Sequence, residues 1–326
     1  MPLPKVFITR KISASAIQKL HGIADVEIWQ EDSPPPHKVL LDRFSHCQAV
    51  LTMLTDPINT EMISNVPADF KVISQMAVGT DNIDVSFATE KKIPVGHTPD
   101  VLTEVCADFT WALLSAICRR IPESFFEVQN GIWRPWGPDV LLGADLFGST
   151  LGIVGLGRIG LAVAKRAYGF NMNILYYSRT RKPELESSFN LKYVPLETLL
   201  AKSDFVSLHV NLSEETLHLL NADTIKLMKQ SAYLVNISRG KVVDSEALTT
   251  AILTNQIAGA ALDVFDPEPI SQNHPLLHQH NVIITPHIAS ASAPVRNKMA
   301  QMAVDNIIAG LAQNQLPYCY NSSIYQ

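Results

Sequence analysis

The chain has few cysteines, and their spacing suits neither a metal site nor a disulfide framework. Only four of its 326 residues are cysteines, and no two of them form a C-x-x-C pair. Zinc sites and disulfide scaffolds are built from closely spaced cysteines in recognisable patterns. We therefore expect no metal and a reducing compartment, with Cys47, Cys106, Cys118 and Cys319 all present as thiols.

Long basic runs and long apolar runs are also missing. The formal net charge is −5, and the basic cluster at 179–182 is short, so the sequence carries no electrostatic footprint for nucleic acid. Charges interrupt every apolar run before the roughly 20 residues that a membrane helix needs. The first residues, MPLPKVFITRK, lack the charged and apolar regions of a secretory signal. We expect a soluble, cytoplasmic protein with neither a nucleic-acid nor a membrane partner.

The composition is that of a folded protein. Hydrophobic residues make up 47% of the chain and charged residues 17%, which argues against disorder. The length corresponds to about two domains of ordinary size.

The first third of the chain alternates short β-branched runs with amphipathic segments. A helix is expected after Ser13, another is expected to start at Asp56-Pro57 with an N-cap followed by an N1 proline, and PPP at 34–36 indicates a loop. Strands separated by helices predict a parallel sheet covered on both faces. The expected strands are 5–9, 25–29, 47–53, 71–77 and 93–97.

A second series of the same kind follows. A long apolar helix is predicted over 101–121, ending before Pro122, and the Trp-, Gly- and Pro-rich segment 131–146 is expected to be irregular. The last helix, 293–311, is expected to return to the first sheet. The expected strands of the second sheet are 150–157, 173–177, 204–210, 232–237, 258–264 and 281–286.

Together these patterns predict an α/β protein with two doubly wound parallel-sheet, Rossmann-like domains and an active-site cleft between them. The predicted catalytic, substrate-binding domain comprises residues 1–100 and 288–326. The predicted dinucleotide-binding domain comprises residues 101–287.

The second sheet begins with a glycine-rich turn. Gly155, Gly157 and Gly160 form G-x-G-x-x-G between a predicted strand and a predicted helix. The first glycine permits a tight turn, the second lets a pyrophosphate approach the backbone, and the third lets the helix pack close to the sheet. The free N–H groups of the helix N-terminus attract phosphate. The spacing and context predict a dinucleotide site.

The next strand ends in SRTRK, where an NAD site usually has an acid that binds the ribose. Arg179, with hydroxyls from Ser178 and Thr180, would instead bind a 2′-phosphate through charge-assisted hydrogen bonds. The alternative is a solvated basic loop. The position of these side chains favours NADP(H), with NAD(H) possible.

Three ionisable residues follow later strands of the second sheet. Arg239, Glu268 and His287 lie in NISRG (236–240), DVFDPEP (263–269) and TPHIAS (285–290). Ligands of open parallel sheets bind beyond the carboxyl ends of the strands, so these side chains are candidates for one site. Singly, each could be an ordinary loop or structural residue.

The motifs together resemble those of the D-isomer-specific 2-hydroxyacid dehydrogenases, and most of all their glyoxylate/hydroxypyruvate reductase branch. The similarity runs over nearly the whole chain. It is carried by AVGTDNID (77–84), TPDVLTE (98–104), GLGRIG (155–160), YYSRTRK (176–182), NISRGKVVD (236–244), ALDVFDPEP (261–269) and TPHIAS (285–290).

The resemblance implies roles for particular residues. Arg239, Glu268 and His287 would form the catalytic set, with Arg239 and His287 contacting the substrate. Backbone N–H groups of Val78 and Gly79 would hold its carboxylate, and Asp263 would lie beside the nicotinamide carboxamide. Further cofactor contacts are implied at Arg158, Ile159, Ile237, Ser238, Arg239, His287 and Ala289.

The chemistry fits these roles. Arg239 can bind the carboxylate of a 2-oxo acid and polarise its carbonyl. His287 as imidazolium can donate a proton to the developing oxyanion, and Glu268 can stabilise and orient that imidazolium. No second basic group among these motifs would hold a substrate phosphate, although Arg134 could reach the cleft. The expected reaction is NADPH-dependent reduction of glyoxylate to glycolate and of hydroxypyruvate to D-glycerate.

Two other functions remain open. One is a D-lactate or D-3-phosphoglycerate type of dehydrogenase that uses NAD, against which the SRT segment argues. The other is a dinucleotide-sensing binding protein like the corepressors that share this scaffold.

The resemblance also implies a homodimer formed through the cofactor domain. Trp133 and Trp136 are candidate interface residues, because aromatic side chains bury much area at low entropic cost. The alternative is that they fold back on their own domain. The sequence departs from the usual pattern at His97, where Asn is common, and at Asn211, where Pro is common.

Overall fold

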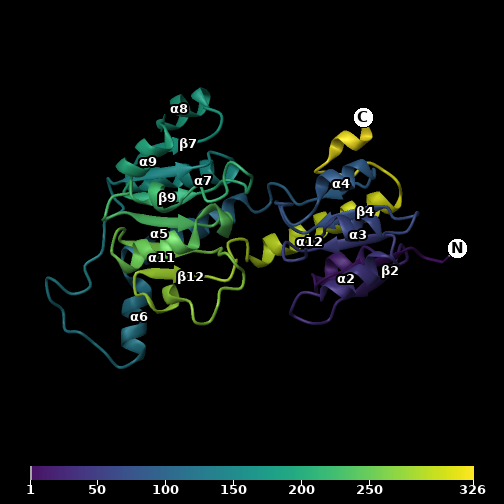
Figure 1. The fold of residues 1–326 in the computed structure, drawn as a ribbon, viewed down its shortest axis with the longest axis horizontal. Coiled ribbons are helices and arrows are strands. Elements are labelled where there is room, and N and C mark those ends of the chain that lie inside the picture. The colour runs from purple at the N-terminus through teal and green to yellow at the C-terminus, as the bar shows by residue number, and fades with distance from the viewer. Residues whose placement is uncertain (1) are drawn as a thin grey trace. The chain divides into compact units, whose positions relative to one another are not determined.

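The computed structural model describes residues 2–326, which divide into two compact units. Unit one comprises the chain up to Leu102 together with Ala291–Gln326, and unit two comprises Thr103–Ser290. Figure 1 shows α12, drawn in yellow, among the N-terminal strands of unit one.

Unit one is built on a five-stranded sheet in the order β2-β1-β3-β4-β5, with every pairing parallel. The inner strands are buried on both faces, which is why they consist mainly of apolar residues. The strands are Lys5–Ile8 (β1), Asp25–Ile28 (β2), Ala49–Thr52 (β3), Val72–Gln75 (β4) and Val95–Gly96 (β5). The helices that precede α12 are Ala14–Gln18 (α1), His37–Phe44 (α2), Thr60–Ser64 (α3) and Val85–Glu90 (α4).

The last long helix completes this unit. Helix α12 (Ala293–Leu311) packs on β3, β4 and α1, as the sequence predicts, and joins the same buried cluster as Val6 and Ile8. Asn306 is the buried polar residue on its inner face. Its Oδ1 accepts from the Tyr318 N–H (3.1 Å), and its Nδ2 donates to the His97 carbonyl (3.2 Å). These bonds tie the C-terminal segment to the end of β5.

Unit two is built on a seven-stranded parallel sheet in the order β12-β11-β10-β9-β6-β7-β8. The strand order reverses between β6 and β9, and ligands bind at such switch points. The strands are Thr150–Val154 (β6), Asn173–Tyr177 (β7), Leu191–Tyr193 (β8), Phe205–Leu208 (β9), Tyr233–Asn236 (β10), Gly259–Leu262 (β11) and Val282–Ile284 (β12). The helices are Thr103–Cys118 (α5), Ile121–Gln129 (α6), Arg158–Ala167 (α7), Pro183–Phe189 (α8), Leu196–Lys202 (α9), Ala222–Ile225 (α10) and Ser245–Leu253 (α11). The 3-10 turns of unit two are Tyr168–Phe170 (η1), Gly240–Val242 (η2) and Pro275–His278 (η3). In unit one, Ser322–Tyr325 (η4) is a further 3-10 turn.

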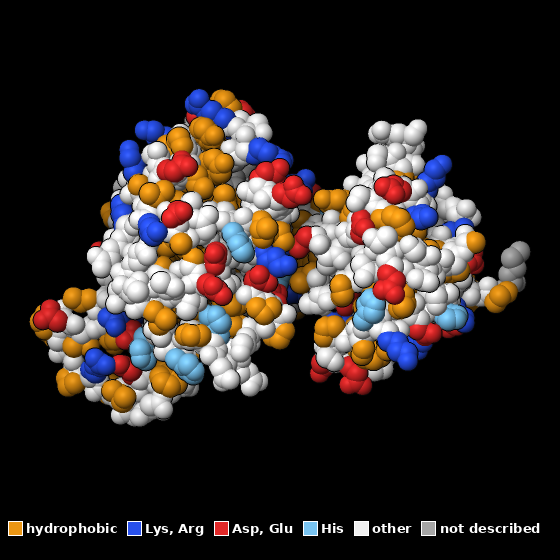
Figure 2. Space-filling view, in the orientation of Figure 1, with side chains coloured by type: hydrophobic (Ala, Val, Ile, Leu, Met, Phe, Trp, Pro, Cys, Tyr) orange, Lys and Arg blue, Asp and Glu red, His pale blue; other side chains and the backbone are white. Residues whose placement is uncertain are grey.

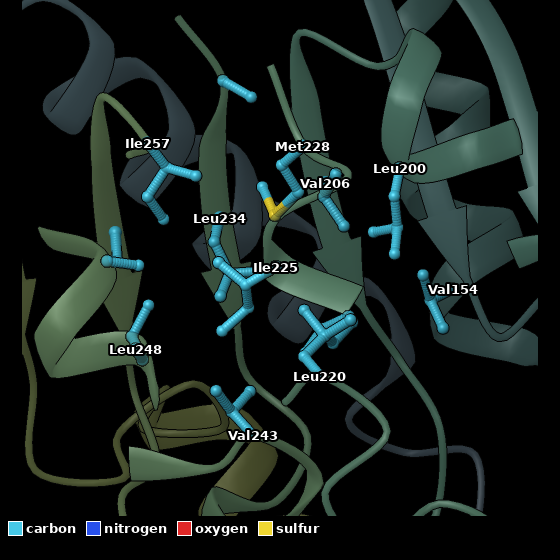
Figure 3. Close-up of a cluster of buried hydrophobic side chains, with 14 of the residues drawn as sticks. Val154, Leu200, Val206, Leu220, Ile225, Met228, Leu234, Val243, Leu248 and Ile257 are labelled. Atoms are coloured by element: carbon cyan, nitrogen blue, oxygen red, sulfur yellow. The ribbon is translucent and has the colours of Figure 1, made fainter. Parts of the chain in front are cut away.

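One face of this sheet packs into a continuous apolar core. Figure 3 shows Val154, Val206 and Leu234 on neighbouring strands, facing side chains from the helices that cover them. Fully burying an aliphatic side chain of this size contributes about 1.5–3 kcal/mol. The core therefore fixes the strand ends that carry the loops described below.

Two predicted helix boundaries are wrong. The predicted helix 101–121 corresponds to α5, which ends at Cys118 rather than at Ile121, and Pro122 lies in the first turn of the next helix, α6, where a proline is tolerated. The predicted start at Asp56-Pro57 is also incorrect. Asn59 caps α3 by accepting from the Met62 N–H, whereas Asp56 is buried and accepts a hydrogen bond from the Thr9 hydroxyl (2.5 Å).

The structure confirms the predicted fold class of two doubly wound parallel sheets. The segment 131–146 contains no helix or strand, as expected, whereas β8 and α6 were not predicted. Across residues 2–326, every helix is too short or too polar to cross a membrane.

Candidate active site

The glycine-rich turn lies at the switch point of the unit-two sheet. Gly155 has φ +98°, which favours glycine, and a Cβ there would lie 2.7 Å from the His209 carbonyl oxygen. A Cβ on Gly160 would lie 2.2 Å from the Gly155 carbonyl oxygen, so only glycine lets α7 approach the turn so closely. Both positions fit the roles that the motif predicts.

The second glycine leaves space where a pyrophosphate would approach. Gly157 is the N-cap of α7, and a Cβ built on it would meet no described atom within 4 Å. As a glycine, Gly157 has no side chain with which to cap the first N–H groups of α7. An open backbone beside a helix N-terminus is the geometry that binds phosphate. These residues fit a dinucleotide.

His209 borders the same turn as a neutral group. Burial lowers the pKa of His209 to about 3, and its Nε2 lies 2.8 Å from the Ser207 hydroxyl. Its Nδ1 is buried without a hydrogen-bond partner among residues 2–326. Buried polar atoms without a partner are uncommon in native structures, so this one marks an unusual position beside the turn. The predictions did not include His209, although its place at the end of β9, next to the switch point, could have indicated it.

The basic cluster after β7 contains cations in different settings. Arg181 forms two hydrogen bonds with the Glu186 carboxylate (2.8 and 2.7 Å), which accepts a third from Tyr176. The side-chain hydrogen bonds from Arg181 lower the pKa of Glu186 to about 2. Arg179, in contrast, is exposed, and no hydrogen bond or ion pair joins it to another of residues 2–326. Arg179 is therefore the arginine of this cluster that is available to a ligand.

Lys182 was not among the predicted cofactor residues, but it reaches the glycine-rich turn. Its Nζ donates to the carbonyl of Leu156 (2.7 Å), which lies between Gly155 and Gly157. The Ser178 hydroxyl donates to the Thr180 carbonyl (2.6 Å), which shapes the end of β7. Position alone could not separate Lys182 from Arg181, since both follow the same strand.

The loop after β10 presents Arg239 and is organised by Asn236. The Asn236 Oδ1 accepts from the N–H and the hydroxyl of Ser238 (2.9 and 2.8 Å), and its Nδ2 donates to the Arg239 carbonyl (2.9 Å). Ile237, Ser238 and Asn236 are buried, whereas Arg239 is partly exposed and its Nη1 donates to the Ser238 carbonyl. Asn236 therefore fixes the backbone from which Arg239 projects, a role that was not predicted.

Two site loops touch at Gly240. A Cβ at this position would lie 2.0 Å from the carbonyl oxygen of Phe265, at the start of the loop that carries Glu268. Because no side chain fits there, the Arg239 loop and the Glu268 loop pack backbone to backbone.

Glu268 and His287 form a hydrogen-bonded pair. His287 Nδ1 lies 3.0 Å from Glu268 Oε2, and the other carboxylate oxygen accepts from the Phe265 N–H (3.0 Å). Burial opposes ionisation of Glu268, but the hydrogen bond from His287, the charges of His287 and Arg239, and the Phe265 N–H outweigh it, so the pKa of Glu268 is lowered. The two side chains are 33% and 22% exposed, so solvent still reaches them. The carboxylate of Glu268 therefore orients the His287 ring through this contact.

Asp263 holds the backbone that carries His287. Its Oδ1 accepts from the Thr285 hydroxyl (2.6 Å) and the Ile288 N–H (2.8 Å), and its Oδ2 accepts from the Ala289 N–H (2.7 Å). His287 itself has φ +54°, a conformation that costs energy for a residue with a Cβ and is often found at functional sites. Asp263 stabilises this turn. Its predicted position beside a carboxamide stays a prediction.

Val78 and Gly79 belong to unit one, in the loop after β4. Both are partly buried. His97, one of the two departures from the usual pattern, places its Nδ1 3.1 Å from the Val78 carbonyl oxygen. Asn211, the other departure, is exposed, and its carbonyl accepts from the Thr216 hydroxyl (2.7 Å).

No cluster of His, Cys, Asp or Glu suited to a metal ion occurs in the part of the chain that the structure describes.

The chain is similar to a known protein family and to named members of it. Residues 111–289 match the profile of the D-isomer specific 2-hydroxyacid dehydrogenase NAD-binding domain. Two proteins named glyoxylate reductase, from Korarchaeum cryptofilum and Pyrococcus horikoshii, are each 48% identical over 307 and 310 residues, covering 94% of this chain and 92% of each of those proteins.

Solved structures agree. A Thermus thermophilus protein superposes with a TM-score of 0.91 at 42% identity, covering 97% of this chain and 99% of the other. The NADPH-dependent glyoxylate/hydroxypyruvate reductase of Sinorhizobium meliloti, in complex with NADP and malonate, gives a TM-score of 0.85 at 30% identity, covering 98% and 97%.

The fold and the glycine-rich turn are those of a nicotinamide dinucleotide-dependent oxidoreductase. The chain belongs to the D-isomer-specific 2-hydroxyacid dehydrogenase family, as its motifs indicate.

Proposed function

We propose that the protein reduces small 2-oxo acids, glyoxylate and hydroxypyruvate, to the corresponding 2-hydroxy acids, with NADPH as the preferred reductant. The observation that carries this proposal is the Glu268–His287 pair (3.0 Å), held beside the loop of Arg239 by the close approach at Gly240. The names of the relatives from Korarchaeum and Pyrococcus support the choice of glyoxylate.

In this proposal each side chain has one task. A bound reduced nicotinamide supplies the hydride. Arg239 binds the substrate carboxylate and polarises the adjacent carbonyl through its forked donors. His287, protonated and oriented by Glu268, donates a proton to the oxygen on which negative charge develops. Val78 and Gly79 would donate backbone N–H groups to a substrate carboxylate.

The preference for NADPH rests on the end of β7. Arg179 and the hydroxyl groups of Ser178 and Thr180 would bind a 2′-phosphate, and no carboxylate occurs within 178–182 to repel it. Gly155, Gly157 and the N-terminus of α7 would hold the pyrophosphate. Ile237, Ser238 and Ala289, which are buried near the strand ends, would line the nicotinamide end.

The proposed substrate is small because little in the site would hold a larger charged group. Arg134, which could have bound a substrate phosphate, pairs with Glu127 on α6. A hydrogen or a hydroxymethyl group next to the carbonyl is therefore favoured over a phosphorylated substituent.

A substrate series tests the function. With NADPH, we expect kcat/KM for glyoxylate and hydroxypyruvate to exceed that for pyruvate by about tenfold or more, since a methyl group gains no polar contact. Phosphohydroxypyruvate should also be poor. A series led by pyruvate or by phosphohydroxypyruvate would assign the protein to another branch of the family. Absence of NADPH oxidation with all four acids would favour a dinucleotide-sensing binding protein.

We also propose that the protein is a homodimer in which a second copy covers α6 and the loop that follows. Figure 1 shows this segment extending from the rest of unit two, and Figure 2 shows hydrophobic side chains along it. Trp133 and Trp136 are 79% and 91% exposed, so neither packs back on its own unit. Exposed apolar patches of this kind are typical of interaction surfaces. The other exposed apolar residues of this segment are Ile121, Phe125, Phe126, Val128, Ile132, Leu142 and Phe147.

Light scattering should give twice the mass of one 35.9 kDa chain. Trp136→Ser with Trp133→Ser should shift the mass toward that of a monomer, because aromatic anchors dominate the energy of such interfaces. A fully active wild-type monomer would contradict the proposed interface.

A cytoplasmic location is proposed as well, supported by four cysteines without disulfide bonds.

A further inference from the structure

The loop after β4 offers backbone N–H groups that the protein itself does not use. Within residues 2–326, no hydrogen bond from the N–H of Val78 or Gly79 is found, and both residues are partly accessible. Successive N–H groups without partners can form a concavity that binds anions. The direction in which they point decides whether they can bind one carboxylate together.

Neighbouring carbonyls set that direction. In a planar trans peptide, the C=O of one residue and the N–H of the next point in opposite directions, so a partner that fixes the first also fixes the second. The Ala77 carbonyl accepts from the Thr98 N–H (2.9 Å), which fixes the N–H of Val78. The Val78 carbonyl accepts from Nδ1 of His97 (3.1 Å), which fixes the N–H of Gly79.

The next carbonyl is held too. Gln75, a buried residue at the end of β4, donates from Nε2 to the Gly79 carbonyl (3.3 Å) and to Asn82 Oδ1 (2.5 Å). Its Oε1 accepts from the Thr52 hydroxyl (2.7 Å). The loop is therefore tied to the sheet on one side and to His97 on the other.

His97 is itself held firmly. Its N–H donates to the Tyr318 carbonyl (3.0 Å), and its carbonyl accepts from Asn306 on α12 (3.2 Å). Its ring packs edge-on against Tyr320, with centroids 5.3 Å apart at 86°. Because a carbonyl oxygen can only accept, the ring nitrogen facing Val78 must carry a proton.

We propose that His97 is a positioning residue for the substrate carboxylate. Its Nδ1–H fixes the Val78–Gly79 peptide so that the Gly79 N–H and the Val78 N–H can bind one carboxylate without rearrangement. This inference rests on the proposed function, because it takes the anion to be the carboxylate of the 2-oxo acid. His97 acts through the peptide and does not take part in hydride or proton transfer.

The test compares two substitutions. His97→Phe keeps an aromatic ring against Tyr320 but removes the donor, and it should raise KM for glyoxylate about 5- to 20-fold, as expected for the loss of one hydrogen bond that orients a charged ligand. The kcat and the KM for NADPH should stay within about twofold, because the proton donor and the cofactor site are untouched. His97→Asn restores an N–H near the position of Nδ1 and should return KM to near the wild-type value.

Matched controls separate positioning from general damage. His46→Phe makes the same change at an exposed histidine on the surface of unit one and should leave every parameter unchanged. Thermal unfolding checks that each variant is folded, and His97→Leu repeats the loss of the donor with a different side chain. An unchanged KM in His97→Phe, or a raised KM that His97→Asn does not rescue, overturns the inference.

Binding of oxalate, measured by calorimetry with NADP⁺ present, reports on the carboxylate site without turnover. Weaker oxalate binding in His97→Phe, rescued in His97→Asn, supports the inference even if wild-type protein fails to reduce glyoxylate, in which case only the proposed function is wrong. Reduction of glyoxylate by wild type, with equal oxalate affinity in all variants, leaves the proposed function intact and refutes the role of His97.

Discussion

Replacing His287 with alanine should lower kcat for glyoxylate reduction by about 10²–10⁴-fold, the usual contribution of a positioned general acid. Steady-state kinetics with NADPH measure the loss. The affinity for NADPH, followed by fluorescence titration, should change little, because the glycine-rich turn and α7 do not depend on this side chain. A loss of kcat below tenfold would mean that another group supplies the proton.

The pH profile tests the pairing with Glu268. Because hydrogen bonds and nearby positive charge lower the pKa of Glu268 despite its burial, this group is a carboxylate at neutral and alkaline pH. A fall in rate with rising pH should then not come from Glu268, so it tests His287 as the proposed proton donor. In Glu268→Gln the fall should begin at lower pH, since the variant no longer stabilises the imidazolium. A profile identical to that of wild type would show that the 3.0 Å contact has no catalytic consequence.

Much of this arrangement is readable from the sequence because position along a parallel sheet is informative. The glycines of 155–160, Arg239, Glu268 and His287 each follow a predicted strand, and the carboxyl ends of parallel strands share one edge. The fold class follows from the alternation of strands and helices, and the last helix is predicted to the residue.

Other features depend on contacts that sequence patterns do not encode. Strand β8 has only three residues, LKY, too few to show a periodicity. Pro122 is compatible with either the end of one helix or the first turn of the next. Asp56 is a residue type that often serves as an N-cap. Here it is buried and bonded to Thr9, a tertiary contact between residues 47 positions apart in the sequence.

The roles of Asn236 and Asp263 in holding the site loops were not predicted, for the same reason. Asn236 and Asp263 act through hydrogen bonds to backbone groups in loops, and those bonds exist only once the strands are paired. Likewise, the sequence places Arg179 and Arg181 two positions apart but cannot show that Glu186 pairs with only one of them.

Because Arg181 is paired and Arg179 is not, among the residues that the structure describes, substitution of Arg179 should have the second large effect, on KM for NADPH. Arg179→Ala should raise KM for NADPH about 10- to 100-fold, because charge-assisted hydrogen bonds to a phosphate are among the strongest that a side chain makes. The KM for NADH should change by less than about twofold, since NADH lacks the 2′-phosphate. Steady-state kinetics with each cofactor at saturating glyoxylate measure the two effects.

Arg181→Ala is the matched control, because it removes the same charge from the same loop but a guanidinium that is already paired with Glu186. It should alter the NADPH to NADH preference far less than Arg179→Ala does, and any effect should fall mainly on stability through the freed carboxylate. The pKa of Glu215 is lowered chiefly by the Ser213 hydroxyl and, least of its causes, by the charge of Arg179, so this carboxylate attracts Arg179 weakly. Glu215→Gln should therefore lower KM for NADPH modestly in wild type and have no such effect in the Arg179→Ala background. If Arg179→Ala raised KM equally for NADPH and NADH, the basic cluster would be only surface charge, and the main support for a preference for NADPH would be lost.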